Sequence, residues 1–325
     1  MLNKTLNPKL FNEDVERISM RDGFSEGLVR AGEEDENLIA VCADLVKSIK
    51  MDAFTQKFPD RLVEVGVAEQ NLVTVASGIA AASKNVFAGS YAIFSPGRNW
   101  EQIRTTICIN NQPVKLVGSH AGIGTGPDGV THQALEDLAL MRVLPNMVVL
   151  SPCDAEETKK ATLAMAKLDM PCYIRFPREE VPVITTKDSP FEIGKAQVFW
   201  EGKDATIIST GEMVYQALLA AKELAESKIS VRVINVSTIK PLDTKCILQA
   251  VEETGAIVTA EDHQVAGGLG SAVSELVSQN FPVPVKMVGI HDRFGESGQP
   301  EELMEKYGLT KEEIIKGVLT VLRMK

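Results

Sequence analysis

Residues 61–71 read Arg-Leu-Val-Glu-Val-Gly-Val-Ala-Glu-Gln-Asn, and an apolar run from Leu72 to Ala82 follows them. The alternation before Gly66 is typical of a short strand, whereas the run after Glu69 is typical of a buried helix. The stretch therefore predicts a strand, a turn at Gly66 and a helix whose first turn carries the Glu69 carboxylate. Because that helix is apolar on too many sides for a surface element, we expect Glu69 at a buried edge or interface. The alternative is an acid that only interacts with the helix dipole.

A glycine-rich loop follows the strand expected at 114–119. It runs from His120 to His132 and contains four glycines, one proline, Asp128 and two of the four histidines of the chain. In α/β proteins, loops at the carboxyl ends of strands carry the ligand-binding groups. This favours a binding loop, although a turn-rich connection with structural histidines stays open as the alternative.

Short β-branched runs alternate with helical stretches along the whole chain. We expect strands at 38–45, 61–65, 86–94, 114–119, 148–151 and 172–176, with helices at 69–83, 99–109, 133–143 and 155–168. The proline-containing segment 177–190 has no periodicity and predicts a linker. Beyond it, we expect strands at 205–209, 230–236, 256–261 and 285–290, and helices at 213–227, 243–254 and 271–280. The chain is therefore expected to be an α/β protein of two successive domains, 1–187 and 188–325, each with a mostly parallel sheet flanked by helices.

The second domain contains a glycine-rich run at 266–272 that superficially suggests a dinucleotide-binding loop. A dinucleotide fingerprint follows the first strand of its βαβ unit, but this run lies late in its domain. We expect these glycines to allow a tight turn and close packing at a helix start. For His263 and His291, which each follow a strand beside an acid, we expect structural hydrogen bonds.

Composition limits the functional classes. A chain of 325 residues with 44% hydrophobic residues can bury at least one large core. Its net charge of −10 argues against non-specific nucleic-acid binding, which needs a basic face. The five cysteines form no short paired spacing, which argues against a disulfide framework or zinc site and for a reduced, cytoplasmic setting. No apolar run approaches the ~20 residues of a membrane span, so we expect a soluble protein.

Several motifs together resemble the C-terminal half of a transketolase, the thiamine-diphosphate enzyme that moves two-carbon ketol units between sugars. The resemblance covers nearly all of the chain, and its markers are Cys42-Ala43-Asp44-Leu45, Gly66-Val67-Ala68-Glu69-Gln70, Ser90-Tyr91-Ala92-Ile93-Phe94, residues 97–104, residues 120–132 and Pro145-Asn146-Met147. A full-length member carries an upstream Gly-Asp-Gly pattern that holds the metal and the coenzyme diphosphate, and this sequence has none. The resemblance therefore implies one subunit of a split transketolase.

That resemblance also implies the partners and cofactors. An N-terminal subunit would supply the ligands of Mg2+ or Ca2+, so no metal ligands are expected on this chain. Thiamine diphosphate would bind between the subunits, and sugar phosphates of the pentose phosphate pathway would be the substrates. By analogy, self-association into a heterotetramer is expected.

Site residues follow from the resemblance position by position. Glu69 would drive the coenzyme pyrimidine into its reactive tautomer, and Tyr91, Phe94 and Asp44 would complete the coenzyme site. A further aromatic of the family falls near Gly97, where this chain has none. The substrate-binding set would be Arg21, Ser48, His120 and Arg175 around a terminal phosphate, and Asp128 and His132 at the sugar hydroxyls, with His120 and His132 also counted as catalytic. For either arginine an ordinary salt bridge is the alternative.

Three other functions stay open. The β subunit of a 2-oxo-acid dehydrogenase has a similar length and two similar domains, and a deoxyxylulose-phosphate-synthase-like enzyme uses the same coenzyme. The third alternative is a non-catalytic regulatory subunit, against which the presence of Glu69 argues. The loop of His120, Asp128 and His132 favours the transketolase.

Overall fold

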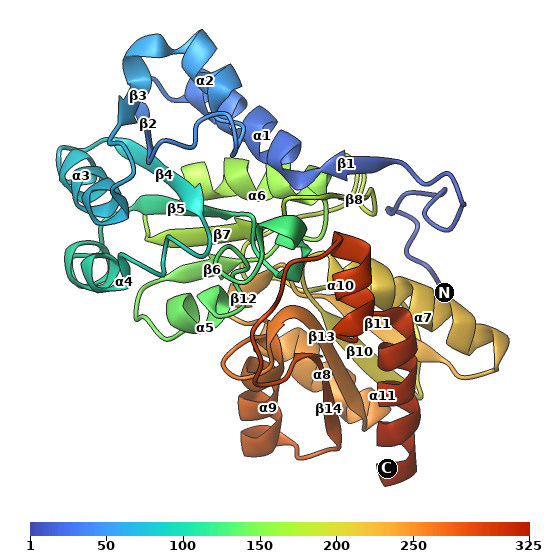
Figure 1. The fold of residues 1–325 in the computed structure, drawn as a ribbon. Helices are drawn as coiled ribbons and strands as arrows, with labels where there is room; N and C mark the ends of the chain where they lie inside the picture. Colours follow the sequence, from blue (N-terminus) through green and yellow to red (C-terminus); the bar gives the residue numbers. More distant parts are fainter.

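The computed structural model describes all residues from 1 to 325 and contains one large sheet in each half of the chain and a separate two-stranded sheet (Figure 1). The first sheet has seven strands in the order β12-β6-β7-β5-β4-β2-β3. All of its pairings are parallel except that of β12. Its strands are β2 (Leu38–Cys42), β3 (Leu62–Glu64), β4 (Asn85–Tyr91), β5 (Val114–Ser119), β6 (Val148–Leu150), β7 (Cys172–Phe176) and β12 (Thr238–Lys240).

Helices cover both faces of this sheet. Their bounds are α1 (Met20–Glu34), α2 (Asp52–Lys57), α3 (Glu69–Ala81), α4 (Trp100–Gln102), a π-helical stretch at Ile103–Cys108, α5 (Asp137–Arg142) and α6 (Ala155–Ala166), with short 3-10 turns at Pro59–Arg61 and Ile123–Asp128. One face packs on α1 and α6 through residues such as Phe24, Leu28 and Met165. The other face packs on α3 and the π-helical stretch through residues such as Leu72 and Ile107.

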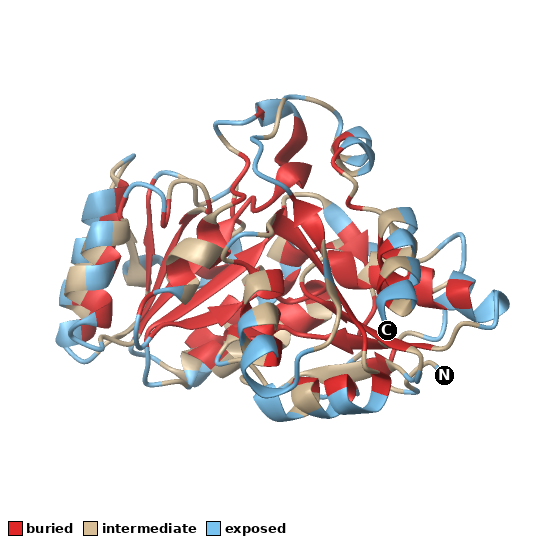
Figure 2. Ribbon diagram, turned by 90° about the horizontal axis from the view of Figure 1, so that it is seen from below, coloured by how far each residue is buried: buried red, intermediate tan, exposed pale blue.

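The second sheet has five strands in the order β14-β13-β10-β11-β9. Only β9 runs antiparallel to its neighbour. The strands are β9 (Gln197–Trp200), β10 (Ala205–Ser209), β11 (Val231–Asn235), β13 (Ile257–Gln264) and β14 (Val285–Ile290), and the helices are α7 (Met213–Glu226), α8 (Thr244–Thr254), α9 (Leu269–Asn280), α10 (Pro300–Lys306) and α11 (Lys311–Met324). Figure 2 shows that the strands of both sheets are buried, while the helices expose their outer faces. The predicted α/β class with two mostly parallel sheets is confirmed.

The two halves of the chain are joined by more than a flexible linker. Strand β12 follows β11 in sequence but pairs with β6, so the second half supplies the edge strand of the first sheet. Within the segment predicted as a linker, β8 (Glu180–Pro182) pairs with β1 (Arg17–Ser19). The N-terminal residues lie on the second half, where the Asn3 amide donates to the Phe199 carbonyl at 2.9 Å.

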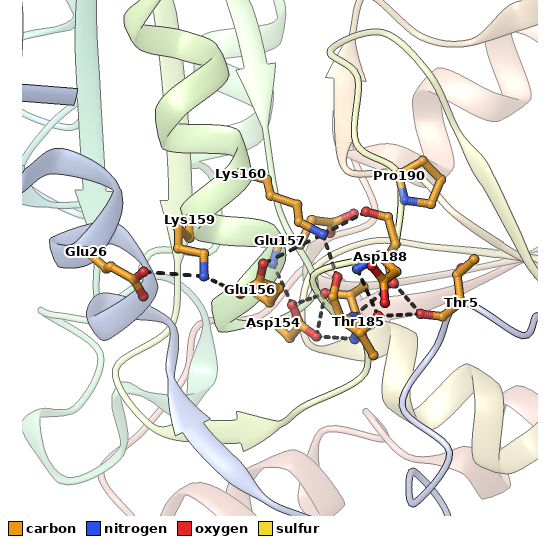
Figure 3. A network of polar contacts seen from close by, with 12 residues as sticks. Thr5, Glu26, Asp154, Glu156, Glu157, Lys159, Lys160, Thr185, Asp188 and Pro190 are labelled. Carbon is orange, nitrogen blue, oxygen red and sulfur yellow. Dashed lines mark hydrogen bonds and ion pairs between the residues drawn. The ribbon is translucent and has the colours of Figure 1, made fainter. Parts of the chain in front are cut away.

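A polar network also holds the connecting segment against α6 (Figure 3). The buried Asp154 carboxylate caps α6 by accepting from the Glu157 amide at 2.8 Å, and it accepts from the Ile184 amide at 2.8 Å. Lys160 Nζ donates to the carbonyls of Thr186 and Ser189. Because the network joins α6 to residues 184–189, this part of the connection is fixed in place.

Two predicted helices differ from the observed ones. The helix expected at 133–143 begins only at Asp137, because the Gln133 side chain donates to the carbonyls of Ile123 and Glu296 and holds its backbone in a loop. The helix expected at 99–109 changes from α to π after Gln102. There the hydroxyls of Thr105 and Thr106 donate to the carbonyls of Glu101 and Gln102.

The glycine-rich run at 266–272 has a structural role. The buried Glu261 carboxylate accepts from the amides of Leu269 and Gly270, each at 2.7 Å, at the first turn of α9. A Cβ on Gly268 would lie 2.0 Å from Glu261 Oε2, so glycine is required for this close approach. The helix start is therefore already bonded to a carboxylate of the protein itself. All five cysteines are free, and no helix has the length and apolar character needed to cross a membrane.

Candidate active site

Glu69 lies at the start of α3, next to the carboxyl end of the first sheet. The turn before it places Gly66 at φ 69°, and the Glu64 carboxylate holds this turn by accepting from the amides of Gly66 at 2.9 Å and Asp44 at 2.7 Å. The Asn99 side chain donates to the Glu69 carbonyl at 2.8 Å. Glu69 is only 5% exposed, so this carboxylate is buried at an edge rather than placed on the surface.

Arg98 is the partner of this carboxylate. Its Nη1 lies 3.1 Å and 3.2 Å from the two carboxylate oxygens of Glu69, and its guanidinium carbon lies 4.3 Å from the centre of the Phe94 ring. No side chain fits at Gly97, because a Cβ there would lie 1.9 Å from the Ile93 carbonyl oxygen. Where the family aromatic is missing, a guanidinium from the next residue therefore contacts both Glu69 and Phe94.

Four rings lie close together on the Phe94 side of Arg98. Tyr91 ends β4, and its ring lies 5.9 Å from that of Phe94, nearly parallel at 20°. The His120 ring stacks on Tyr91 at 3.9 Å, and the His132 ring meets the edge of Phe94 at 5.3 Å. The structure therefore brings together Glu69, the two aromatic rings and both histidines of the glycine-rich loop.

Two arginines, Arg21 and Arg178, lie near His120 and are together called the cationic group here. Arg21 donates to the Ser48 carbonyl at 3.1 Å and to the Arg178 carbonyl at 2.7 Å. Burial, followed by the charges of Arg21 and Arg178, lowers the pKa of His120 to about 3. His120 is therefore a neutral imidazole at ordinary pH, and its Nδ1 lies 2.9 Å from the Ser119 hydroxyl.

Two expected site residues lie at the rim of this region. Asp128 is exposed, and its carboxylate lies 3.6 Å from Arg178 Nη1. Asp44 is also exposed, directly after β2 with φ 59°, and its carboxylate accepts no hydrogen bond within the chain. Both carboxylates are therefore accessible to a ligand or a second subunit.

Arg175, in contrast, is placed away from the cationic group. Its guanidinium is buried between the two halves of the chain, where Nε lies 3.1 Å from Asp137 Oδ2 and Nη1 donates to the Asp262 carbonyl at 2.9 Å. Arg175 is only 5% exposed and does not line the cleft that Arg21 and Arg178 line. Arg178, three residues later and beyond the end of β7, lies beside Arg21 and His120 instead. The sequence pattern does not predict which of the two arginines lies beside His120.

A cleft of about 940 Å³ opens next to the cationic group. Arg17, Arg21 and Arg178 line one wall, and the other wall comes from the second half of the chain, including Tyr215 and α10. The cleft therefore lies between the two halves of the chain, and Arg21 and Arg178 face it. No group of three or more His, Cys, Asp or Glu side chains is arranged to hold a metal ion.

Glu212, one of the residues that line this cleft, lies next to a second carboxyl group. Asp262 is buried, and Glu212, at the N-terminus of α7, shares a hydrogen bond with it. Burial, followed by the Asp262 charge, raises the pKa of Glu212 to about 8. Below pH ~4.5 this group is protonated in both the folded and unfolded chains. As the pH rises toward 8 only the unfolded chain loses the proton, so the contribution of Glu212 to stability is lost across this window.

We expect the thermal midpoint of the chain to fall between pH 6 and pH 8.5, and Glu212→Gln to reduce that fall by about 4 °C. The glutamine cannot ionise, so it keeps a neutral group beside Asp262 at every pH. Differential scanning calorimetry of the wild-type chain and the variant measures the difference, with Glu226→Gln at an exposed site of the same helix as the control. An identical pH dependence in all three proteins would contradict the assignment.

Comparison with known proteins agrees with this geometry. Residues 16–183 match the pyrimidine-binding domain of transketolase, and residues 194–314 match the transketolase C-terminal domain. The chain therefore belongs to the transketolase family.

The similar proteins include subunits of split enzymes. The chain is 39% identical to a 6-deoxy-6-sulfo-D-fructose transketolase subunit of Clostridium sp. (strain MSTE9), over 97% of this chain and 98% of that protein. It is 38% identical to one subunit of an apulose-4-phosphate transketolase of Phocaeicola vulgatus, over 94% and 98%. A solved structure described as a split gene transketolase, inactive beta4 tetramer, superposes with a TM-score of 0.89 at 44% identity, covering 95% of this chain and 99% of that one.

Proposed function

We propose that the chain is the C-terminal subunit of a thiamine-diphosphate-dependent transketolase that moves a two-carbon ketol unit from a ketose phosphate to an aldose phosphate. The observation that carries this proposal is the buried Glu69 carboxylate, which Arg98 connects to the stacked rings of Phe94 and Tyr91. An N-terminal subunit would complete the site with the metal and diphosphate ligands. The family and the split-gene relatives support this division of the site.

The residues present fit the pyrimidine of the coenzyme. The Arg98 guanidinium, a planar group with N–H donors, already stacks on Phe94 and bonds to both Glu69 oxygens. A protonated pyrimidine would make the same two contacts. When bound, thiamine diphosphate supplies the carbon nucleophile that takes up and releases the ketol unit. Glu69 would hold a proton at ring nitrogen N1′, while Tyr91 and Phe94 would exclude water.

The histidines serve the sugar in this proposal. Because His120 stays neutral, its imidazole would donate a single hydrogen bond to the terminal phosphate beside Arg21 and Arg178 without adding a charge. His132 is only partly buried, and its Nδ1 lies 2.9 Å from the Thr131 hydroxyl. In this proposal His132 would exchange a proton with a hydroxyl near the reacting carbons. Asp128 would bind a neighbouring hydroxyl.

Arg21 and Arg178 would bind the terminal anion of the sugar. Guanidinium groups bind the oxygens of a phosphate with two parallel hydrogen bonds, and a sulfonate offers similar oxygens. Of the two relatives described above, one is named for a sulfo sugar and the other for a phosphorylated sugar. We expect a terminal anion to be required and phosphate to be the preferred one. We further propose that the enzyme acts in pentose phosphate metabolism in the cytoplasm and that its subunits form a heterotetramer.

Reconstitution tests the function directly. The purified chain would be mixed with its N-terminal partner, thiamine diphosphate, Mg2+, D-xylulose 5-phosphate and D-ribose 5-phosphate, and ketol transfer would be followed by chromatography of the sugar products. We expect transfer only with both subunits present. Decarboxylation of a 2-oxo acid instead would support a dehydrogenase β subunit, and coenzyme binding without turnover would support a regulatory subunit.

A further inference from the structure

The loop of residues 120–132, here called the substrate loop, is held from the second half of the chain. Asp262 lies near the end of β13 and is 5% exposed. Both of its carboxylate oxygens lie 3.1 Å from the Ile123 amide nitrogen in the substrate loop. A buried carboxylate of one domain therefore bonds the backbone of a loop that belongs to the other.

The shape of the substrate loop fits this carboxylate closely. Gly122 has φ 84°, and a Cβ there would lie 1.6 Å from Asp262 Oδ2. Only a glycine lets the loop backbone approach so near. Two residues before Gly122, His120 has φ 59°, an unusual conformation for a residue other than glycine. The loop is thus held in a defined conformation beside Asp262.

Hydrogen bonds connect this part of the loop with two residues that are proposed to bind the substrate. The buried Thr125 hydroxyl donates to the His120 carbonyl at 2.8 Å, and Arg178 Nη1 lies 3.4 Å from the Thr125 carbonyl. Ile123, which Asp262 holds, lies between His120 and Thr125 in sequence. A shift of the loop at Ile123 would therefore move both the His120 imidazole and the support of the Arg178 guanidinium.

Asp262 is itself fixed by the buried arginine that lies outside the site. Arg175 Nη1 donates to the Asp262 carbonyl, while Arg175 Nη2 donates to the Ala134 carbonyl at 3.4 Å, just after the substrate loop. The Asp137 carboxylate holds Arg175 and accepts from the Tyr173 hydroxyl at 2.7 Å. Both ends of the substrate loop are thus tied to one buried group of side chains.

We propose that Asp262 is a positioning residue for the sugar-binding groups, acting from the C-terminal domain through the Ile123 amide on His120 and Arg178. This inference rests on the proposed function. It gives the C-terminal domain, which supplies none of the proposed catalytic residues, a part in substrate binding. Asp262 touches no substrate in this scheme, and the coenzyme groups Glu69, Tyr91 and Phe94 lie on other elements.

Two variants test the proposal in the reconstituted enzyme. Asp262→Asn keeps the size but removes the charge and places an amide group against the Ile123 N–H. Gly122→Ala leaves Asp262 intact and pushes the loop away from it. For both we expect the KM for D-xylulose 5-phosphate to rise about 10-fold, with a smaller change in kcat and an unchanged Kd for thiamine diphosphate.

Matched controls separate positioning from general destabilisation. Asp243→Asn alters another acid of the second half, one that caps α8 and accepts from the Ala196 amide far from the substrate loop. Gly255→Ala places an alanine at another positive φ, 64°, after α8, where only the flexible Lys325 side chain is near. We expect both controls to lose thermal stability without a selective rise in KM.

A spectroscopic measurement on the full chain alone does not depend on turnover. The chain has only four histidines, so ring signals of 13C-labelled histidine can be assigned by substitution. We expect the His120 signals to move in Asp262→Asn and Gly122→Ala but not in the controls. Unmoved His120 signals together with an unchanged KM would overturn the proposal. If the wild-type pair catalyses no ketol transfer, the proposed function fails, and the His120 signals still decide the role of Asp262.

Discussion

Glu69→Gln is expected to lower kcat of the reconstituted enzyme by about 10³-fold. The amide cannot hold a proton at the pyrimidine nitrogen as a carboxyl group does, although it has nearly the same size. The fold should persist, because the Asn99 side chain bonds the Glu69 backbone carbonyl and not its carboxylate. Steady-state kinetics gives kcat, and circular dichroism with a thermal melt checks the fold.

Glu101→Gln is the matched control for this variant. Glu101 is an exposed glutamate of α4, and its carboxylate accepts only from the neighbouring Gln102. Its loss should leave kcat within about twofold of the wild-type value. If Glu69→Gln kept comparable activity, Glu69 would not act on the coenzyme and the proposed function would lose its main support.

Arg178→Ala is expected to raise the KM for D-xylulose 5-phosphate by about 10- to 100-fold, the loss of one or two charge-assisted hydrogen bonds. The same variant should change kcat/KM for unphosphorylated D-xylulose by less than about threefold, since that sugar has no anion to bind. Initial-rate measurements with the two donors compare these effects.

Two further arginines make the Arg178 prediction specific. Arg104 is exposed within the π-helical stretch, and Arg104→Ala should affect neither donor. Arg175→Ala should lower thermal stability, because it leaves the buried Asp137 carboxylate without its cation. If Arg175→Ala selectively raised the KM for the phosphorylated donor while Arg178→Ala did not, the phosphate would be bound by Arg175.

The positions of the proposed coenzyme-binding residues could be predicted because these residues follow one another closely in sequence. A strand, a tight turn and an apolar helix fix the position of Glu69 locally, while Tyr91 ends a buried strand and Phe94 follows three residues later. The missing aromatic at Gly97 was also visible in the sequence. That Arg98 would contact both Glu69 and Phe94 depends on side-chain directions, which the sequence pattern does not give.

The cationic half was harder to predict because it depends on contacts between distant segments. Arg175 and Arg178 are three residues apart, and only the end of β7 decides which one reaches His120. Asp262 reaches the substrate loop from more than a hundred residues away, beyond the range of any local pattern. The exchange of β12 into the first sheet, and the pairing of β1 with β8, likewise depend on tertiary packing.

Strand β12 has a consequence for how such chains can be recombined. Because β12 closes the edge of the sheet that carries Glu69, the C-terminal part cannot be swapped for that of a relative as a free-standing cassette. A hybrid gene would have to bring a strand whose backbone and side chains match β6, or leave that edge open to self-assembly. Because the two halves share this sheet, we expect them to be exchanged between related genes only together.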